Sequence, residues 1–408
     1  MACPDPVATI GDVEPPLAAI RYLADDALEG RRAGTEGEHC ATAFIAAEFA
    51  RLGLEPLGDN GTFFQSVPLA SVLNPHAPGG TGRNVIGVLR GGDAELSKEF
   101  VVIGAHHDHL GDGGFGSLAP GQDSIHNGAD DNASGVAALL RAAELLTAGH
   151  KPARSIVFMT FTGEESGLLG SAHFASHATV PLSAVVGMLN MDMVGRLGHQ
   201  PLIVYGVDTA EEWNGLLAPA ASSAGVQLAT RGEGYGPSDH TSFYARDIPV
   251  LHFFTNVHGD YHRPTDDWPR IDAAGIQKVA AIVTEVARRV ADGRPAITLR
   301  RGAGQPIEPG QGRAQGSGAY LGSVPDFTPV ERGVKLSGVS PGSPAEKAGL
   351  RSGDILTGLG THDVADLQGL TDALGAHEPG DTVEVRYLRD GREHKVELVL
   401  GSRARRNG

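Results

Sequence analysis

Residues 101–109 read VVIGAHHDH, and this stretch constrains the fold more than any other. Its first half is apolar and rich in β-branched residues, which is typical of a short buried strand. His106 and Asp108 follow directly. Open α/β folds place their sites at the carboxyl ends of parallel strands, and a carboxylate near a histidine can orient its ring. The stretch therefore predicts an α/β fold with a polar site at one sheet edge.

Apolar runs and helical spacing alternate between about residues 17 and 291. This alternation predicts a three-layer α/β sandwich, with a mostly parallel mixed sheet flanked by helices. We expect the strands at 84–89 and 100–105 to pair across the Gly91–Gly92 turn region. The other strands are predicted at 155–161, 185–191, 201–205 and 249–254, and the helices at 17–28, 40–52, 133–148, 210–224 and 273–291.

The chain has 408 residues, more than one hydrophobic core usually serves. Its composition changes after residue 293, where prolines and glycines accumulate as in a linker. We therefore expect a first domain at residues 1–293, a linker at 294–317, a small β domain at 318–402 and a polar tail at 403–408.

The formal net charge is −16. This argues against a nucleic-acid partner, because non-specific binding to phosphates rests on lysine and arginine. No apolar run approaches the roughly 18 residues that a membrane span needs. The two cysteines, Cys3 and Cys40, leave open whether a disulfide forms. No signal peptide is visible, so the sequence alone leaves open a cytoplasmic protein or the mature form of an exported one.

Acidic and imidazole side chains gather where the predicted strands end. Two histidines and three carboxylates make a ligand set for two divalent ions that share one carboxylate. Nitrogen and oxygen ligands without thiolates favour zinc. The groups are His106 with Asp108, Asp130 with Asp131, Glu164 with Glu165, Asp192, and Tyr261 with His262 near Asp266 and Asp267.

Five stretches that hold these residues resemble the motifs of the co-catalytic di-zinc aminopeptidases, relatives of glutamate carboxypeptidase and glutaminyl cyclase. In chain order they are GAHHDHLG, NGADDNASG, TGEESGLLGS, NMDMVG and YHRPTDD. The resemblance covers about residues 17–291. It implies two zinc ions per chain and hydrolysis of the N-terminal bond of peptide substrates that have a free N-terminus. It also implies a secreted or periplasmic protein.

The motif positions imply a role for each metal-site residue. His106 and Asp192 would hold one zinc, and Glu165 and His262 would hold the other. Asp131 would bridge the two ions, and the family's non-proline cis peptide would follow this aspartate.

Three further residues match catalytic roles in the family. Glu164 would act as the general base that takes a proton from the attacking water and passes it to the leaving amine. Asp108 would orient the His106 ring, and Tyr261 would donate a hydrogen bond to the developing oxyanion.

Other polar residues near the motifs have simpler explanations. Asp130 is the alternative to Asp131 as the bridging ligand, although local turn hydrogen bonding suits it better. His107, His109 and His126 fit loop or pocket-wall positions better than ligand positions.

Two other patterns match known functional motifs but lack the structural context that those motifs require. Ser238, Asp239 and His240 are consecutive and lack a nucleophile elbow, so they do not predict a catalytic triad. The G-x-G-x-x-G pattern at 111–116 does not predict a dinucleotide site, because the residues after it do not open a helix.

The C-terminal region resembles PDZ domains. Residues 343–356 read SPAEKAGLRSGDIL, which is similar to their helix-turn-strand signature, and Tyr320-Leu321-Gly322 is similar to their carboxylate-binding loop. The resemblance implies a groove for peptide C-termini, with a helix at 363–377 along its other wall.

Other functions stay open at this stage. A carboxypeptidase or dipeptidase of the same fold would require a free substrate carboxylate. A glutaminyl cyclase-like or non-catalytic peptide-binding protein is the alternative from another class.

Overall fold

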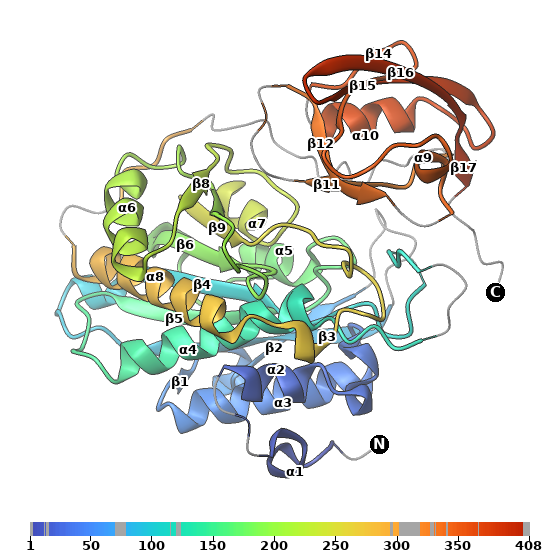
Figure 1. The fold of residues 1–408 in the computed structure, drawn as a ribbon. Helices are drawn as coiled ribbons and strands as arrows, with labels where there is room; N and C mark the ends of the chain where they lie inside the picture. Colours follow the sequence, from blue (N-terminus) through green and yellow to red (C-terminus); the bar gives the residue numbers. More distant parts are fainter. Residues whose placement is uncertain are drawn as a thin grey trace. The chain divides into compact units, whose positions relative to one another are not determined.

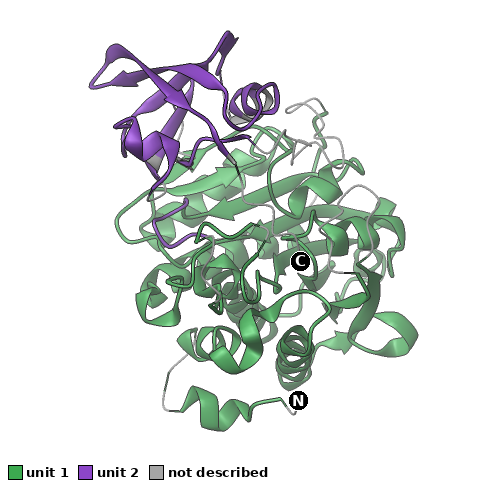
Figure 2. Ribbon diagram, turned by 90° about the vertical axis from the view of Figure 1, so that its right-hand side faces the viewer, with its two compact units in different colours: residues 1–255, 262–307 green, residues 256–261, 308–408 purple. Residues whose placement is uncertain are grey.

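The computed structural model describes residues 3–11, 13, 16–69, 79–114, 116–119, 124–293, 297–301, 319–326, 330, 332–339, 342–365 and 367–402. The chain divides into two compact units (Figure 2). Unit 1 comprises residues 1–255 and 262–307, and unit 2 comprises residues 256–261 and 308–408. Most of the predicted linker at 294–317 and the whole tail at 403–408 lie outside the described residues, so the predicted domain boundaries stay predictions.

Unit 1 is built around a mixed sheet in which the described residues supply nine strands, in the order β1-β3-β5-β4-β6-β9-β7-β8 with β2 paired to β3 (Figure 1). β4 runs parallel to β5 and β6, and β6 runs parallel to β9. The strands are β1 (Glu55–Pro56), β2 (Phe64–Pro68), β3 (Thr81–Leu89), β4 (Phe100–His106), β5 (Ser155–Phe161), β6 (Val185–Met191), β7 (Leu202–Tyr205), β8 (Leu228–Thr230) and β9 (Val250–Phe254).

One predicted pairing is wrong. β3 and β4 are consecutive strands, but β5 lies between them: it pairs antiparallel with β3 and parallel with β4. The Gly91–Gly92 region is therefore not a hairpin turn. Gly91 donates its backbone N–H to Oγ of Ser155, and Gly92 donates to the carbonyl of Pro152. The turn thus packs against the start of β5.

Helices cover both faces of the sheet, so the predicted three-layer sandwich is confirmed. One apolar core joins α2, α3, α4, α6 and α8 to one face, and a second core joins α5 and α7 to the other. The helices of unit 1 are α1 (Pro6–Ile10), α2 (Leu17–Leu23), α3 (Glu36–Arg51), α4 (Gly135–Thr147), α5 (Leu169–Ser176), α6 (Trp213–Ala224), α7 (His240–Tyr244) and α8 (Ala273–Asp292).

The two helix boundaries that differ most from the sequence prediction, by about one turn each, are set by local capping. The Thr35 side chain accepts the N–H of Glu38, so α3 begins one turn before the predicted residue 40. The helix predicted at 17–28 ends with α2, and the 3-10 turn η1 (Asp26–Arg31) follows. Asp25 caps this turn by accepting the N–H of Ala27.

The central parallel strands all end at the same edge of the sheet. β4 ends at His106, β5 at Phe161 and β6 at Met191, and their register pairs His106 with Phe161. The residues that follow these ends are the predicted site residues Asp108, Glu164 and Asp192.

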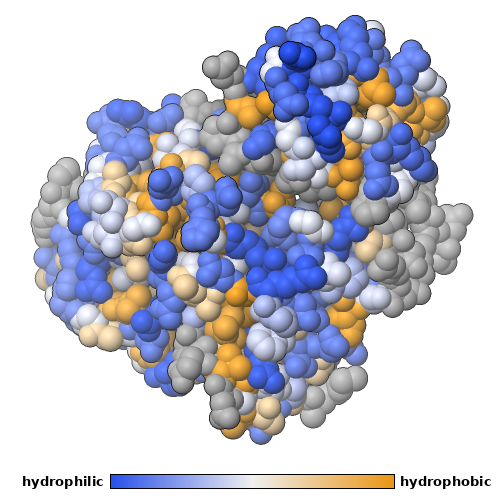
Figure 3. All heavy atoms as spheres, in the orientation of Figure 1, coloured by the Kyte–Doolittle hydropathy of each residue, from blue (hydrophilic) through white to orange (hydrophobic). Residues whose placement is uncertain are grey.

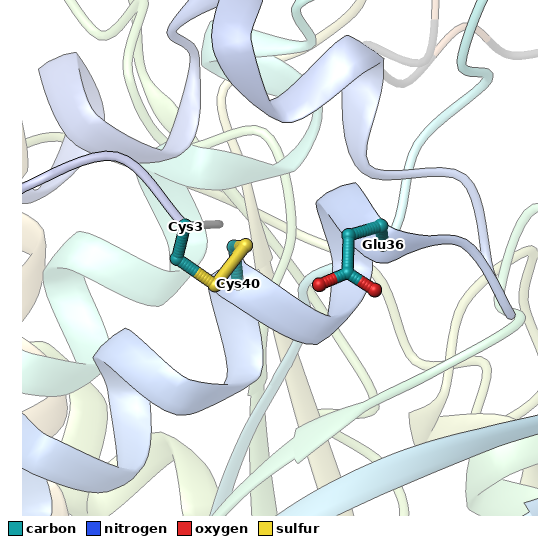
Figure 4. Close-up of side chains that lie close together, drawn as sticks. All are labelled: Cys3, Glu36 and Cys40. Atoms are coloured by element: carbon teal, nitrogen blue, oxygen red, sulfur yellow. A yellow bond between two sulfur atoms is a disulfide. The ribbon is translucent and has the colours of Figure 1, made fainter. Parts of the chain in front are cut away.

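The N-terminal segment is covalently attached to α3. Cys3 and Cys40 form a disulfide, with Cα atoms 5.3 Å apart (Figure 4). Glu36 lies close to both sulfurs. Because the sulfurs are bonded to each other, they cannot act as thiolate ligands for a metal ion.

Unit 2 contains a small β domain with its own core, as predicted. Its main sheet has the order β11-β12-β13-β15-β16, with β14 paired to β13, and β10 pairs with β17. Leu336, Leu356 and Val385 are among its buried residues. The elements are β10 (Ala319–Tyr320), β11 (Ser323–Asp326), β12 (Val334–Val339), α9 (Pro344–Lys347), β13 (Ile355–Leu359), β14 (His362–Asp363), α10 (Leu367–Gly375), β15 (Thr382–Arg389), β16 (Arg392–Val399) and β17 (Gly401–Ser402).

Hydrophilic residues cover much of the face drawn in Figure 3. Among the described residues, the large hydrophobic side chains that are strongly exposed are Val7 and Val399. None of the described helices combines the length and the apolar character of a membrane span.

Candidate active site and metal centre

His106 lies at the end of β4 with its two ring nitrogens in different surroundings. Nδ1 donates to the backbone carbonyl of Asp108 at 3.2 Å. Nε2 therefore carries the lone pair, and it lies 3.3 Å from Oδ1 of Asp131 and 3.3 Å from Oδ1 of Asp192. The structure thus brings together the three residues predicted around one ion.

His262 has the same arrangement on the other side of Asp131. Its Nδ1 donates to the carbonyl of Gly116 at 2.8 Å. Its Nε2 lies 3.1 Å from Oδ2 of Asp131 and 3.2 Å from Oε2 of Glu165. The two oxygens of Asp131 therefore face two separate groups of donors, as expected of a bridging carboxylate.

These distances fit metal ligands. Zinc bonds nitrogen and oxygen at about 2.0–2.2 Å, so tetrahedral ligands of one ion lie roughly 3.3–3.5 Å apart. Nε2 of His106 and of His262 each face two carboxylate oxygens at about this spacing. An N–H shared between two acceptors is poorly aligned with at least one of them, so a cation among these groups accounts for the arrangement better than hydrogen bonds do. All five predicted ligands are buried.

Neighbouring polar groups hold Asp131 in place. The Asp266 carboxylate accepts the backbone N–H groups of Asp130 and Asp131 at 2.9 and 3.0 Å. The Asn132 side chain accepts from Gly135 and donates to the carbonyl of Met191. The peptide bond between Asp131 and Asn132 is cis, which confirms the expectation from the family motif.

Glu164 and Glu165 are adjacent but differ electrostatically. Burial raises the pKa of the Glu164 carboxyl well above its usual value; the charge of His106 opposes this effect and that of Glu165 adds to it. Burial would also raise the pKa of Glu165, but the charge of His262 and the hydrogen bonds from His109 and His262 together outweigh burial and lower that pKa. Opposite shifts on adjacent carboxyls suit a proton acceptor beside a ligand.

The other two predicted catalytic residues are close in sequence to predicted ligands: Asp108 to His106, and Tyr261 to His262. Asp108 accepts the backbone N–H of Glu164 through Oδ1 at 3.1 Å, while that oxygen lies 3.7 Å from Nδ1 of His106. Tyr261 directly precedes His262 and is half-buried. Its role toward an oxyanion stays a prediction.

Several residues set aside in the sequence have local partners instead. Oδ1 of Asp130 accepts the N–H of Gly195 at 2.6 Å. His107 contacts Thr160 and Glu38, and His126 contacts Ser117 and Ser124. Both ring nitrogens of His240 are buried and have no hydrogen-bond partner among the described residues, so no Ser238–His240 relay exists. No helix begins in the described part of residues 111–128, which agrees with the rejection of a dinucleotide site.

Sequence reasoning missed two residues of the centre. The first is His109, whose Nδ1 lies 2.8 Å from Oε1 of Glu165 and 3.9 Å from Oδ2 of Asp131. It was assigned to a loop or pocket wall. Its position three residues after His106, in the loop that leaves the strand, was the available signal.

The second missed residue is Arg31, which is fully buried. Its guanidinium donates to backbone carbonyls at the end of α2 and in two loops: those of Leu23, His107, Asn127 and Gly128. Burial lowers the pKa of Arg31 to about 10, against the charges of Asp108 and other carboxylates nearby. A pKa of about 10 still leaves the group a cation at neutral pH. Arg31 therefore holds together the loops that carry His106 and Asp131.

Comparison with known proteins agrees with this geometry. Residues 84–287 match Peptidase family M28, and residues 321–400 match the PDZ domain. A probable leucine aminopeptidase of Arthroderma otae is 30% identical over 205 residues, which cover 48% of this chain and 55% of that protein. The chain thus spans about half the length of the curated relatives that it matches.

Solved structures share the fold of unit 1. A Zn-dependent exopeptidase from Parabacteroides distasonis has a TM-score of 0.55 at 21% identity, covering 70% of this chain and 99% of that one. A glutaminyl cyclase of Bacteroides thetaiotaomicron has a TM-score of 0.54 at 19% identity, covering 67% and 96%. The match to the family extends over half of the sequence and includes all five motifs in full. The chain therefore belongs to peptidase family M28 and carries a PDZ domain after its peptidase domain.

Proposed function

We propose that the protein is a zinc-dependent aminopeptidase that binds two zinc ions and removes residues from the free N-terminus of peptides. The observation that carries the proposal is the position of Asp131 between His106 and His262, with one carboxylate oxygen toward each Nε2. Asp192 completes the first donor group, and Glu165 completes the second.

Each residue has a defined task in this reaction. His106, Asp131 and Asp192 would hold one zinc, and Asp131, Glu165 and His262 the other. When bound, the ions supply Lewis acidity and lower the pKa of water.

Glu164 accepts a proton from the attacking water as the water oxygen bonds to the scissile carbonyl carbon. It then returns that proton to the amine when the C–N bond breaks. Its raised pKa suits a group that both takes and gives a proton. Tyr261 would donate its hydroxyl hydrogen to the oxygen on which negative charge develops.

The adjacent glutamates provide the sharpest test of this assignment. Glu164→Gln should lose turnover by orders of magnitude while zinc stays bound. Glu165→Gln should lose zinc affinity, because it removes a predicted ligand. Unchanged turnover in Glu164→Gln would remove this residue from the base role.

The substrate class needs its own assay. Aminoacyl-anilides and their N-acetylated forms should be compared with and without a chelator, and we expect hydrolysis of the free amines only, abolished by chelation. Hydrolysis that requires a free carboxylate would indicate a carboxypeptidase or dipeptidase instead. Cyclisation of N-terminal glutamine without hydrolysis would indicate a cyclase.

For the PDZ domain we propose binding of peptide C-termini. Gly322 has a φ of 83°, which lets the loop turn after Leu321, and Leu321 accepts the N–H of Ala345. A C-terminal peptide library should bind the full chain, and amidated versions of the peptides should not. Equal binding of both forms would contradict carboxylate recognition.

We also propose that the protein works outside the cytoplasm. The Cys3–Cys40 disulfide supports this, since such bonds persist in oxidising compartments. Non-reducing digestion of protein from its native source should yield the linked peptides. Free thiols at both positions would contradict the proposal.

A further inference from the structure

We propose that His109 is a positioning residue, which donates a hydrogen bond from Nδ1 to Oε1 of Glu165 and so turns Oε2 of that ligand toward the metal. The inference rests on the proposed function. It assigns a role to an imidazole that lies inside the metal centre but outside the predicted ligand set.

Distances distinguish a hydrogen bond from shared coordination. Nδ1 of His109 lies 2.8 Å from Oε1 of Glu165, which is a hydrogen-bond length and shorter than the spacing of two ligands on one zinc. The same nitrogen lies 3.9 Å from Oδ2 of Asp131, too far for a hydrogen bond. The predicted ligand contacts lie instead at 3.1–3.3 Å.

The two oxygens of Glu165 therefore face different partners. Oε1 faces the His109 ring, while Oε2 lies 3.2 Å from Nε2 of His262. A donor fixed on one oxygen restricts rotation of the carboxylate and leaves the other oxygen for the ion. Hydrogen bonds of this kind to ligating carboxylates tune metal affinity.

The surroundings of His109 fix its ring. Its backbone N–H donates to the carbonyl of Arg31 at 3.2 Å. Its ring lies edge-on to that of His262, with centroids 5.8 Å apart. A Cβ at Gly128 would clash with the His109 ring. Backbone of η1 and of the loop before Asp131 thus holds the imidazole against Glu165.

The second ring nitrogen indicates that this placement serves the site. Nε2 of His109 is buried and has no hydrogen-bond partner among the described residues. An unpaired buried nitrogen lowers the stability of the folded state, so a histidine at this position is not explained by stability alone. The hydrogen bond that the ring does make is to Glu165.

Two substitutions test whether His109 acts by donating a hydrogen bond to Glu165. His109→Leu removes the donor, whereas His109→Asn keeps an amide N–H near the place of Nδ1. His173→Leu, on α5 and away from both donor groups, controls for loss of an imidazole. Zinc affinity is measured by competition with a chromophoric chelator, and cobalt stoichiometry and absorption are measured at saturation.

We expect His109→Leu to bind zinc about 10- to 100-fold more weakly at one site, with unchanged cobalt stoichiometry and absorption. His109→Asn should recover most of the affinity. A changed saturated cobalt spectrum, or wild-type affinity in His109→Leu, would overturn the proposal.

A measurement on the unaltered protein covers the case in which His109→Leu does not fold. In the zinc-loaded chain, ¹⁵N shifts should show a protonated Nδ1 on His109, and a deprotonated Nδ1 would make it a ligand and overturn the proposal. Both readouts are independent of hydrolysis. A protein that binds zinc with this His109 dependence but cleaves no peptide would refute the proposed function and leave the inference standing.

Discussion

The backbone N–H of Glu164 donates a hydrogen bond to Oδ1 of Asp108, with nitrogen and oxygen 3.1 Å apart. The sequence assigned Asp108 to the His106 ring, but its carboxylate is closer to the residue predicted to be the general base. Asp108 therefore joins the end of β4 to the loop after β5.

This contact predicts the effect of changing Asp108. Asp108→Ala removes the acceptor and should lower kcat about 10- to 100-fold at saturating zinc, because the Glu164 backbone loses its anchor. Asp108→Asn keeps an oxygen in the same place and should retain more activity. Steady-state kinetics on an aminoacyl-anilide would measure the difference, and equal rates for both variants would argue against the anchoring role.

Arg31 gives a stability prediction. Arg31→Met leaves backbone carbonyls at the end of α2 and in two loops without their buried donor, and we expect a loss of about 3 kcal/mol or more in the free energy of unfolding. Arg32→Met is the matched control, because Arg32 is the exposed neighbour and should change stability by less than about 0.5 kcal/mol. Urea denaturation measures both. Similar losses in the two variants would show that the buried contacts of Arg31 contribute little.

The sequence predicted the site residues better than it predicted the order of strands in the sheet. Parallel strands bring their carboxyl ends together whatever the strand order, so the positions of His106 and Asp192 after apolar runs were sufficient to predict their convergence. The insertion of β5 between β3 and β4 was not predictable from local pattern, because apolar periodicity does not encode which strands are neighbours.

His109 and Arg31 show why the rest of the site was missed. Both lie in irregular segments, where side-chain direction depends on the tertiary contacts of the loop rather than on a repeat. The role of Arg31 depends on the carbonyls of His107 and Gly128. Only the folded loops bring these carbonyls to the arginine, so the sequence of the turn does not predict the role.

His252 predicts a dependence of stability on pH. Burial lowers its pKa to about 4, whereas an unfolded histidine titrates near 6.5. Between these values the unfolded chain binds a proton that the folded chain does not. The stability of the folded protein with neutral His252 is therefore complete above about pH 6.5, and part of it is lost as the pH falls toward 4.

The change in unfolding free energy is at most about 3.4 kcal/mol, from a pKa difference of roughly 2.5 at 1.36 kcal/mol per pKa unit. His252→Asn cannot titrate, so its unfolding free energy should fall less steeply from pH 7 to pH 4.5 than that of the unaltered protein. Parallel pH profiles would show that His252 does not contribute.

The disulfide predicts a sensitivity of the peptidase domain to reduction. Cys3 and Cys40 are separated by 37 positions, and the loop that they close contains α1, α2 and η1 with Arg31. Closing a loop of this length lowers the entropy of the unfolded chain. A loss of about 2–4 kcal/mol in the free energy of unfolding is therefore expected for Cys3→Ser.

The Cys3→Ser variant also serves as the control for the effect of a reductant. Dithiothreitol should lower the urea midpoint of the unaltered protein to that of Cys3→Ser and leave the variant unchanged. Because η1 holds Arg31, reduction should also loosen the loops around His106 and Asp131, so the reduced protein should lose zinc to a chelator faster. A midpoint that does not respond to reductant would mean that the N-terminal segment is held by packing alone.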